Sequence, residues 1–134
     1  MLQLVWNFAA QVAGGPAVTA TSSPEIGAID KAVVKIKNDG NDVEVDLQPA
    51  ALDKLLLLVV HSSVPTADVT VIISDGAGTP KKTGKLPLTQ PLLLAGASLS
   101  LLPGAPLKAI LNFAKVVGSP DIWATIELVA ARKT

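Results

Sequence analysis

Leu55-Leu56-Leu57-Leu58-Val59-Val60 is the stretch that decides the fold of this chain. Six apolar residues are too few to cross a bilayer, which takes about 20. The run ends in β-branched valines and lies between polar segments, which favours a strand buried on both faces. The alternative is a helix that begins in residues 48–54, with Pro49 at its first position. We expect at most one helical turn there, followed by the strand.

Segments that alternate with a period of two flank the apolar run. Before it, Val43, Val45 and Leu47 alternate with carboxylates, and after it the sequence of residues 69–73 is VTVII. Alternation of this kind places successive side chains on opposite faces of a strand. A buried strand between two such segments predicts the centre of an antiparallel sheet system.

A β-hairpin is predicted over residues 31–47. The segments KAVVKIK (31–37) and DVEVDL (42–47) flank Asn38-Asp39-Gly40-Asn41, where Asp-Gly accepts a positive φ angle. In such a hairpin the lysines of the first arm would form cross-strand pairs with the carboxylates of the second. The charged residues concerned are Lys35, Lys37, Asp42, Glu44 and Asp46.

Further strands are predicted along the whole chain. Residues 2–8 alternate with an aromatic face, residues 17–23 suit a weak edge strand, and residues 122–131 alternate again. Residues 107–114 are compatible with a strand or a short helix, and we favour the strand. The prolines at 87 and 91 exclude a central strand there. The prediction is one domain, 1–134: an all-β, antiparallel β-sandwich, jelly-roll-like, with roughly eight to ten strands and little helix.

The composition indicates a protein that associates with others. The chain has 134 residues, of which 49% are hydrophobic and only 16% charged, against about 25% charged in an ordinary domain. So few charges leave apolar surface for another subunit to cover. The formal net charge of zero argues against binding to nucleic acid or to an anionic membrane. No segment is a convincing membrane span or signal peptide, and there is no cysteine.

The sequence offers no convincing catalytic, cofactor or metal site. His61 is the only histidine, and Ser62 or Ser63 with His61 and Asp53 or Asp75 has no nucleophile-elbow context. Alternate carboxylates in residues 42–46 stand about 7 Å apart on a strand, which favours a solvated face over a cation site. We therefore expect a protein that is not an enzyme and has no cofactor.

The expected functional surface is apolar. Residues 92–94 and 99–102 hold more leucines than regular core strands can take in a region interrupted by Pro and Gly, and the opening strand is free to pair with a neighbouring chain. Trp123 shares a strand face with Glu127, which favours an exposed anchor. The candidate interface residues are Leu2, Leu4, Trp6, Leu92, Leu93, Leu94 and Trp123.

Several stretches together resemble the capsid cement, or decoration, proteins of tailed bacteriophages. They are QVAGGP (11–16), VEVDLQP (43–49), LLLLVVHSS (55–63), ISDG (73–76) and IELVAARKT (126–134). The resemblance implies a jelly-roll-like fold, no enzymatic activity, a place on the exterior of the virion capsid, and the major capsid protein as partner, with a second copy of the chain beside it in a dimer or trimer. The alternatives are a carbohydrate- or receptor-binding β-sandwich module that uses Trp123, or a tail or adaptor component of the virion.

Overall fold

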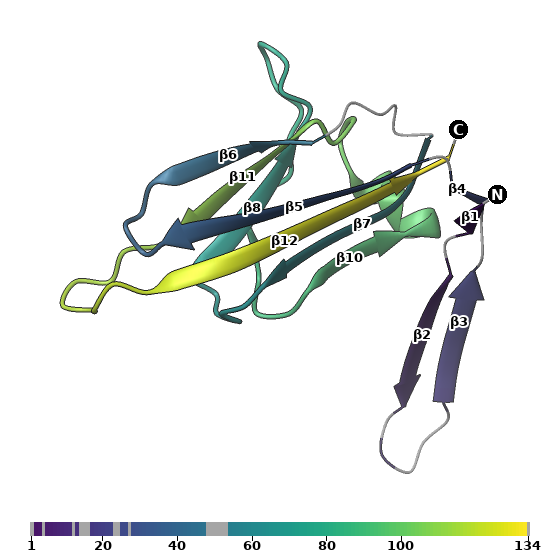
Figure 1. Cartoon of the computed structure of the whole chain (residues 1–134), viewed down its shortest axis with the longest axis horizontal. Helices are drawn as coiled ribbons and strands as arrows, with labels where there is room; N and C mark the ends of the chain where they lie inside the picture. The colour runs from purple at the N-terminus through teal and green to yellow at the C-terminus, as the bar shows by residue number, and fades with distance from the viewer. Residues whose placement is uncertain are drawn as a thin grey trace.

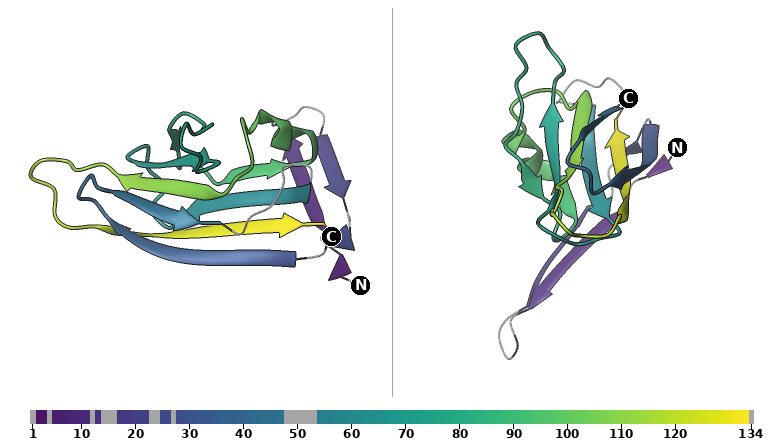
Figure 2. Two further views of the ribbon diagram at one scale, coloured as in Figure 1. Left: turned by 90° about the horizontal axis from the view of Figure 1, so that it is seen from above. Right: turned by 90° about the vertical axis from the view of Figure 1, so that its left-hand side faces the viewer.

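Two four-stranded antiparallel sheets, packed face to face, form the body of the molecule in the computed structural model (Figures 1 and 2). The structure describes residues 2–3, 5–11, 13, 17–22, 25–26, 28–47 and 54–133, with side chains for residues 5, 13, 28–47 and 54–133. Sheet 1 has the order β10 (Leu92–Ala95), β7 (Leu55–Ser62), β12 (Trp123–Arg132), β5 (Ala28–Lys37). Sheet 2 has the order β6 (Asp42–Asp46), β11 (Lys108–Phe113), β8 (Val69–Ser74), β9 (Leu86–Pro87).

The strand pairing of the sandwich is that of a jelly roll. The first of its eight strands pairs with the last, β5 with β12, and the pairs nest inward as β6 with β11, β7 with β10 and β8 with β9. The pairs β7–β12 and β8–β11 then join these into two sheets. This connectivity is two Greek keys wrapped into a double sheet. It confirms the predicted all-β, jelly-roll-like sandwich with little helix.

The LLLLVV run lies in β7, an inner strand of sheet 1, as predicted. Leu58 and Val60 point into the core and are 0% exposed. On the opposite face Leu57 is buried, but Val59 is half-buried and His61 is exposed. Only the first half of the strand is thus buried on both faces. The expected helical turn falls mainly on residues 48–53, which lie outside the described residues.

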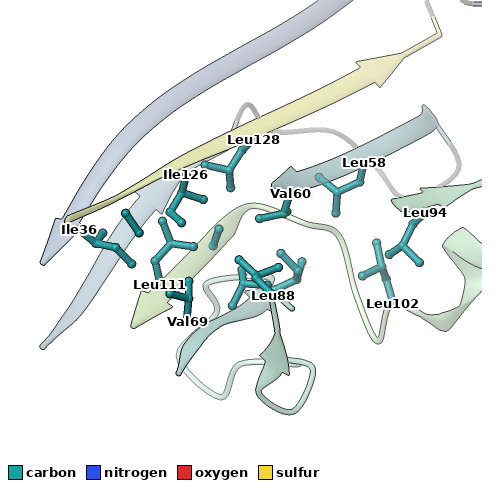
Figure 3. Packing of buried hydrophobic residues seen from close by; sticks show 14 of the residues in the cluster. Ile36, Leu58, Val60, Val69, Leu88, Leu94, Leu102, Leu111, Ile126 and Leu128 are labelled. Atoms are coloured by element: carbon teal, nitrogen blue, oxygen red, sulfur yellow. The ribbon is translucent and has the colours of Figure 1, made fainter. Parts of the chain in front are cut away.

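The core fills the space between the inner faces of the two sheets (Figure 3). Each fully buried leucine or isoleucine in it contributes about 1.5–3 kcal/mol relative to an exposed position. Leu94 and Leu102 lie at one end of this core, next to the edge of sheet 1. Figure 3 labels Ile36, Leu58, Val60, Val69, Leu88, Leu94, Leu102, Leu111, Ile126 and Leu128.

The predicted hairpin over residues 31–47 is wrong. β5 pairs with β12 and β6 pairs with β11, so the chain crosses from one sheet to the other at residues 38–41. The turn itself lies where it was predicted, with Gly40 at φ 76°. Alternation shows that β5 and β6 each have an apolar face. These two faces pack across the core from each other instead of lying side by side in one sheet. A period of two does not distinguish the two arrangements.

The expected charge pairs between the two arms are therefore absent among the described residues. Lys37 instead pairs with Asp121 at 3.2 Å, and Glu44 pairs with Lys108 at 3.5 Å. Asn38 ties the crossover to the loop that precedes β12: its side-chain amide donates to the Pro120 carbonyl, and its side-chain oxygen accepts from the Ile122 N–H.

The other predicted strands are confirmed at β8, β11 and β12, and the short β9, which contains Pro87, is an edge strand. The single strand predicted over residues 2–8 is divided into β1 (Leu2–Gln3) and β2 (Trp6–Gln11). β1 pairs with β4 (Glu25–Ile26), and β2 pairs with β3 (Ala17–Ser22), the expected weak strand. In Figure 1 the β2–β3 hairpin projects away from the sandwich. We call this hairpin the arm.

Candidate interaction surfaces

An open apolar groove of about 390 Å³ lies where the edges of the two sheets meet, between β9 and β10. Leu86 of β9 forms one wall, and Leu92 and Leu94 of β10 form the other, because alternate residues of β10 point inward between the sheets. We call this the leucine groove. Its lining is Lys82, Thr83, Gly84, Leu86, Leu92, Leu94, Leu101, Leu102 and Pro103.

The short 3-10 helix η2 (Gly96–Leu101) explains why one leucine of the groove is left exposed. In a 3-10 helix, residues three apart share a face. Leu99 and Leu102 are accordingly both buried in the core. Leu101 does not share their face and is 75% exposed. The Ser98 hydroxyl donates to the Ala95 carbonyl and accepts from the Ala95 N–H, which fixes the first turn. The exposure of Leu101 therefore follows from the local fold.

The groove wall opposite η2 is also held in place by hydrogen bonds. Thr83 accepts a hydrogen bond from the Ile73 N–H with its hydroxyl, and its own N–H donates to the Ile73 carbonyl. These bonds attach residues 82–84 to the edge of sheet 2. The groove is therefore bounded by hydrogen-bonded backbone on both sides, and Lys82 is the one charged residue among the described residues that line it.

The outer face of sheet 1 is the second apolar surface. Leu93, Val59, Val129 and Lys31 form one row across its four strands, and Ala95, Leu57, Ala131 and Ile29 form the next. Ile29 is 54%, Val33 56% and Leu93 48% exposed. The other half of this face is mainly polar: His61, Glu127 and Val33 form the row on the other side of Lys31, and Thr125 and Lys35 follow. We define the outer patch as Ile29, Val33, Val59, Leu93 and Val129.

The four edge strands of the sandwich differ in how they are protected from pairing with another chain. Edge strands are commonly blocked by charged residues or by proline. β5 carries lysines at 31, 35 and 37, β6 carries carboxylates at 42, 44 and 46, and β9 contains Pro87. β10, with the sequence LLLA, has neither a charge nor a proline. The least protected edge thus lies directly beside the leucine groove.

Trp123 lies at the start of β12, 58% exposed, on the outer face of sheet 1 as predicted. Lys37 is its cross-strand partner, and the Lys37–Asp121 ion pair lies at the same end. An exposed indole beside polar groups suits stacking on a sugar ring or insertion into a protein pocket.

The residues considered for chemistry are not brought together. His61 is exposed on the outer face of sheet 1, whereas Ser62 is buried on the inner face, where its hydroxyl donates to the Val64 carbonyl. Asp75 accepts from the N–H groups of Ala77 and Lys81 and so organises its own loop. Asp53, the other carboxylate considered, lies outside the described residues.

The carboxylates of β6 are on the exposed face of sheet 2. Asp42 accepts a hydrogen bond from the Asn112 side chain, and Glu44 is paired with Lys108. Across the part of the chain that the structure describes, no three His, Cys, Asp or Glu residues gather as a metal site, and no helix there is long and apolar enough to span a membrane.

The candidate interface residues lie in three different parts of the molecule. Leu92 and Leu94 line the groove, Leu94 being buried at its base, while Leu93 and Trp123 are on the outer face of sheet 1. Leu2 and Trp6 are in β1 and β2, whose side chains the structure does not describe, and Leu4 lies outside the described residues. Sequence reasoning missed Ile29 and Val33, because both occur in a segment dominated by lysines.

Neither family models, curated proteins nor solved structures provide a match to this chain.

Proposed function

We propose that this chain is a capsid cement, or decoration, protein of a tailed bacteriophage, which binds the outside of the major capsid protein shell. The observation that carries the proposal is the outer patch, an exposed apolar area on a jelly-roll sandwich. Jelly rolls occur in viral capsid proteins and in lectins, so the fold supports the proposal by analogy alone. The resemblance of the sequence to cement proteins supports it from a separate direction.

The outer patch suits a permanent contact with a large, regular partner. It combines three exposed apolar residues, Ile29, Val33 and Leu93, with flanking valines that are half-buried. On the outer face of β5, Lys31 lies between Ile29 and Val33, and Lys35 follows Val33. Lysines thus alternate with the apolar residues at this edge, where the rim of a protein–protein interface is commonly polar. A cement protein repeats such a contact over many symmetric sites, so a modest affinity per copy stabilises the whole shell.

The polar end of the same face supports a second candidate, a carbohydrate- or receptor-binding module. Its evidence is Trp123, exposed beside Lys37 and Asp121. Titration of Trp123 fluorescence with an array of glycans separates the two functions, because a lectin would show saturable quenching with particular sugars, and Trp123→Ala would abolish it.

The cement function is tested by co-sedimentation with shells assembled from the major capsid protein of the same genome. Wild type, Leu93→Asp and Val33→Asp are compared, because these two residues lie on opposite edges of the outer patch. Val117→Asp is the matched control, since Val117 is 94% exposed in the loop after β11, away from the patch.

The proposal predicts that wild type and Val117→Asp bind the shells, and that Leu93→Asp and Val33→Asp bind at least about tenfold more weakly. Moderate salt should weaken binding only slightly, because an apolar contact is not screened. No binding by wild type, or binding that salt abolishes while both patch variants behave as wild type, contradicts the proposal.

A further inference from the structure

The arm has no partner strand within its own sandwich. Among the described residues, β2 pairs only with β3, in a register that runs from Trp6 opposite Ser22 to Gln11 opposite Ala17. A two-stranded hairpin alone is marginally stable in water and needs a surface to pack against. Because the arm projects away from the sandwich (Figure 1), that surface is expected on another molecule.

The sequence and register give the arm one apolar and one polar face. By strand alternation, Trp6, Phe8 and Ala10 belong to one face. The register assigns Ser22, Ala20 and Val18, their partners on β3, to the same face. The other face carries Asn7, Gln11, Thr19 and Thr21 among its residues. None of the twelve strand residues is charged.

The leucine groove and β10 have the complementary properties. The groove is mainly apolar, with Lys82 as the one charged residue in the described part of its lining, and its volume of about 390 Å³ lies within the range of sites that enclose bulky apolar groups. Among the four edge strands that the structure describes, β10 alone contains no lysine, carboxylate or proline. Such an edge accepts an added strand through its main-chain groups.

We propose that the arm of a second copy of this chain docks along β10 with its Trp6–Phe8 face over the leucine groove, and that two copies exchange arms reciprocally to form a dimer. Two aromatic side chains can bury roughly 400 Å² per arm, and main-chain pairing along β10 adds to each contact. Because the exchange is reciprocal, the dimer contains this contact twice. Exchange of identical elements also closes the assembly with two-fold symmetry.

Sedimentation equilibrium of the full chain over a wide concentration range provides the first test. Wild type should form a dimer, and 1 M NaCl should not weaken it, because neither surface depends on charge. Leu101→Asp should raise the dissociation constant at least about tenfold. Val117→Asp is the control, because it adds the same charge at an exposed apolar residue outside the groove. Circular dichroism verifies that both variants are folded.

Cross-linking identifies the contact and the chain that supplies it. The protein has no cysteine, so Ala20→Cys and Leu101→Cys are prepared as separate proteins and mixed under oxidising conditions. The proposal predicts a disulfide-linked heterodimer in the mixture, which forms faster than the disulfide-linked homodimer of either protein alone. A double variant that cross-links only within one chain would mean that the arm occupies its own groove, and the proposal would be wrong. The proposal is also wrong if wild type is monomeric at all concentrations, or if Leu101→Asp and Val117→Asp weaken the dimer equally.

This dimer is independent of the outer patch. Val33→Asp should remain dimeric while losing affinity for the shell, and Leu101→Asp tests the dimer alone. Failure of shell binding therefore does not refute arm exchange, and a monomeric protein that still binds shells refutes only arm exchange.

Discussion

Replacement of Leu58 by alanine tests the packing of the jelly roll, because leucines that are more exposed, in β10 and in η2, provide a graded comparison. Leu58 is 0% exposed, Leu93 48% and Leu101 75%. Truncating a fully buried leucine removes its transfer free energy and leaves a cavity, which together cost about 3–4 kcal/mol. Leu93→Ala loses only about half of the transfer term and opens no enclosed cavity, so it should cost about 1 kcal/mol. Leu101→Ala should cost about 0.5 kcal/mol.

The assay is unfolding in guanidinium chloride, followed by circular dichroism at a concentration low enough for the monomer. The predicted order of destabilisation is Leu58→Ala, then Leu93→Ala, then Leu101→Ala. Leu58→Ala should also lower the melting temperature by about 12–16 °C, at about 4 °C per kcal/mol for a chain of this size. If Leu101→Ala destabilises the fold as much as Leu58→Ala does, the assignment of inner and outer residues is incorrect.

Other predictions concern the crossover between the sheets and its loops. Gly40→Val should cost about 2 kcal/mol of stability, because Gly40 has φ 76° and a β-branched residue resists positive φ. The control Gly78→Val, in an open loop position, should cost less than about 0.5 kcal/mol. Equal melting temperatures of the two variants would contradict this. Asn38→Ala should cost about 1–3 kcal/mol by leaving the Ile122 N–H without its acceptor and the Pro120 carbonyl without its donor. Asn38→Asp keeps the acceptor but sets a carboxylate oxygen against the Pro120 carbonyl, so it should not restore wild-type stability; denaturant titration measures both. The hydrogen bond from the Asn41 N–H lowers the pKa of Asp39 below its ordinary 3.8, so Asp39 contributes stability above that pH and loses the contribution as the pH falls through the lowered value. A carboxyl pKa of Asp39 at or above 3.8 in an NMR titration would rule this out.

The sequence allowed the fold class to be predicted because the physics behind it is local. Alternation along β8, β11 and β12, and the apolar run in β7, reflect which side of a sheet each residue occupies. The partner of each strand depends on distant packing instead. β5 and β6 are adjacent in the chain and joined by a good turn sequence, yet they belong to different sheets because each completes a ladder with β12 or β11.

The surfaces were predictable in part. The excess of leucines in residues 92–102 indicated an exposed apolar region, but the division of these leucines between the groove and the outer face depends on η2 and on the phase of β10. Ile29 and Val33 lie on the same sheet face as Leu93 only because of the pairing of four strands. Such a patch has no signature in any one segment of the sequence.

Cryo-electron microscopy of the virion from the same genome tests the central claim most directly. We expect each copy of the jelly roll to lie on the outer surface of the capsid shell, with Val33 and Leu93 facing the major capsid protein. Absence of the protein from the shell, or its presence only in the tail, would contradict the proposed function.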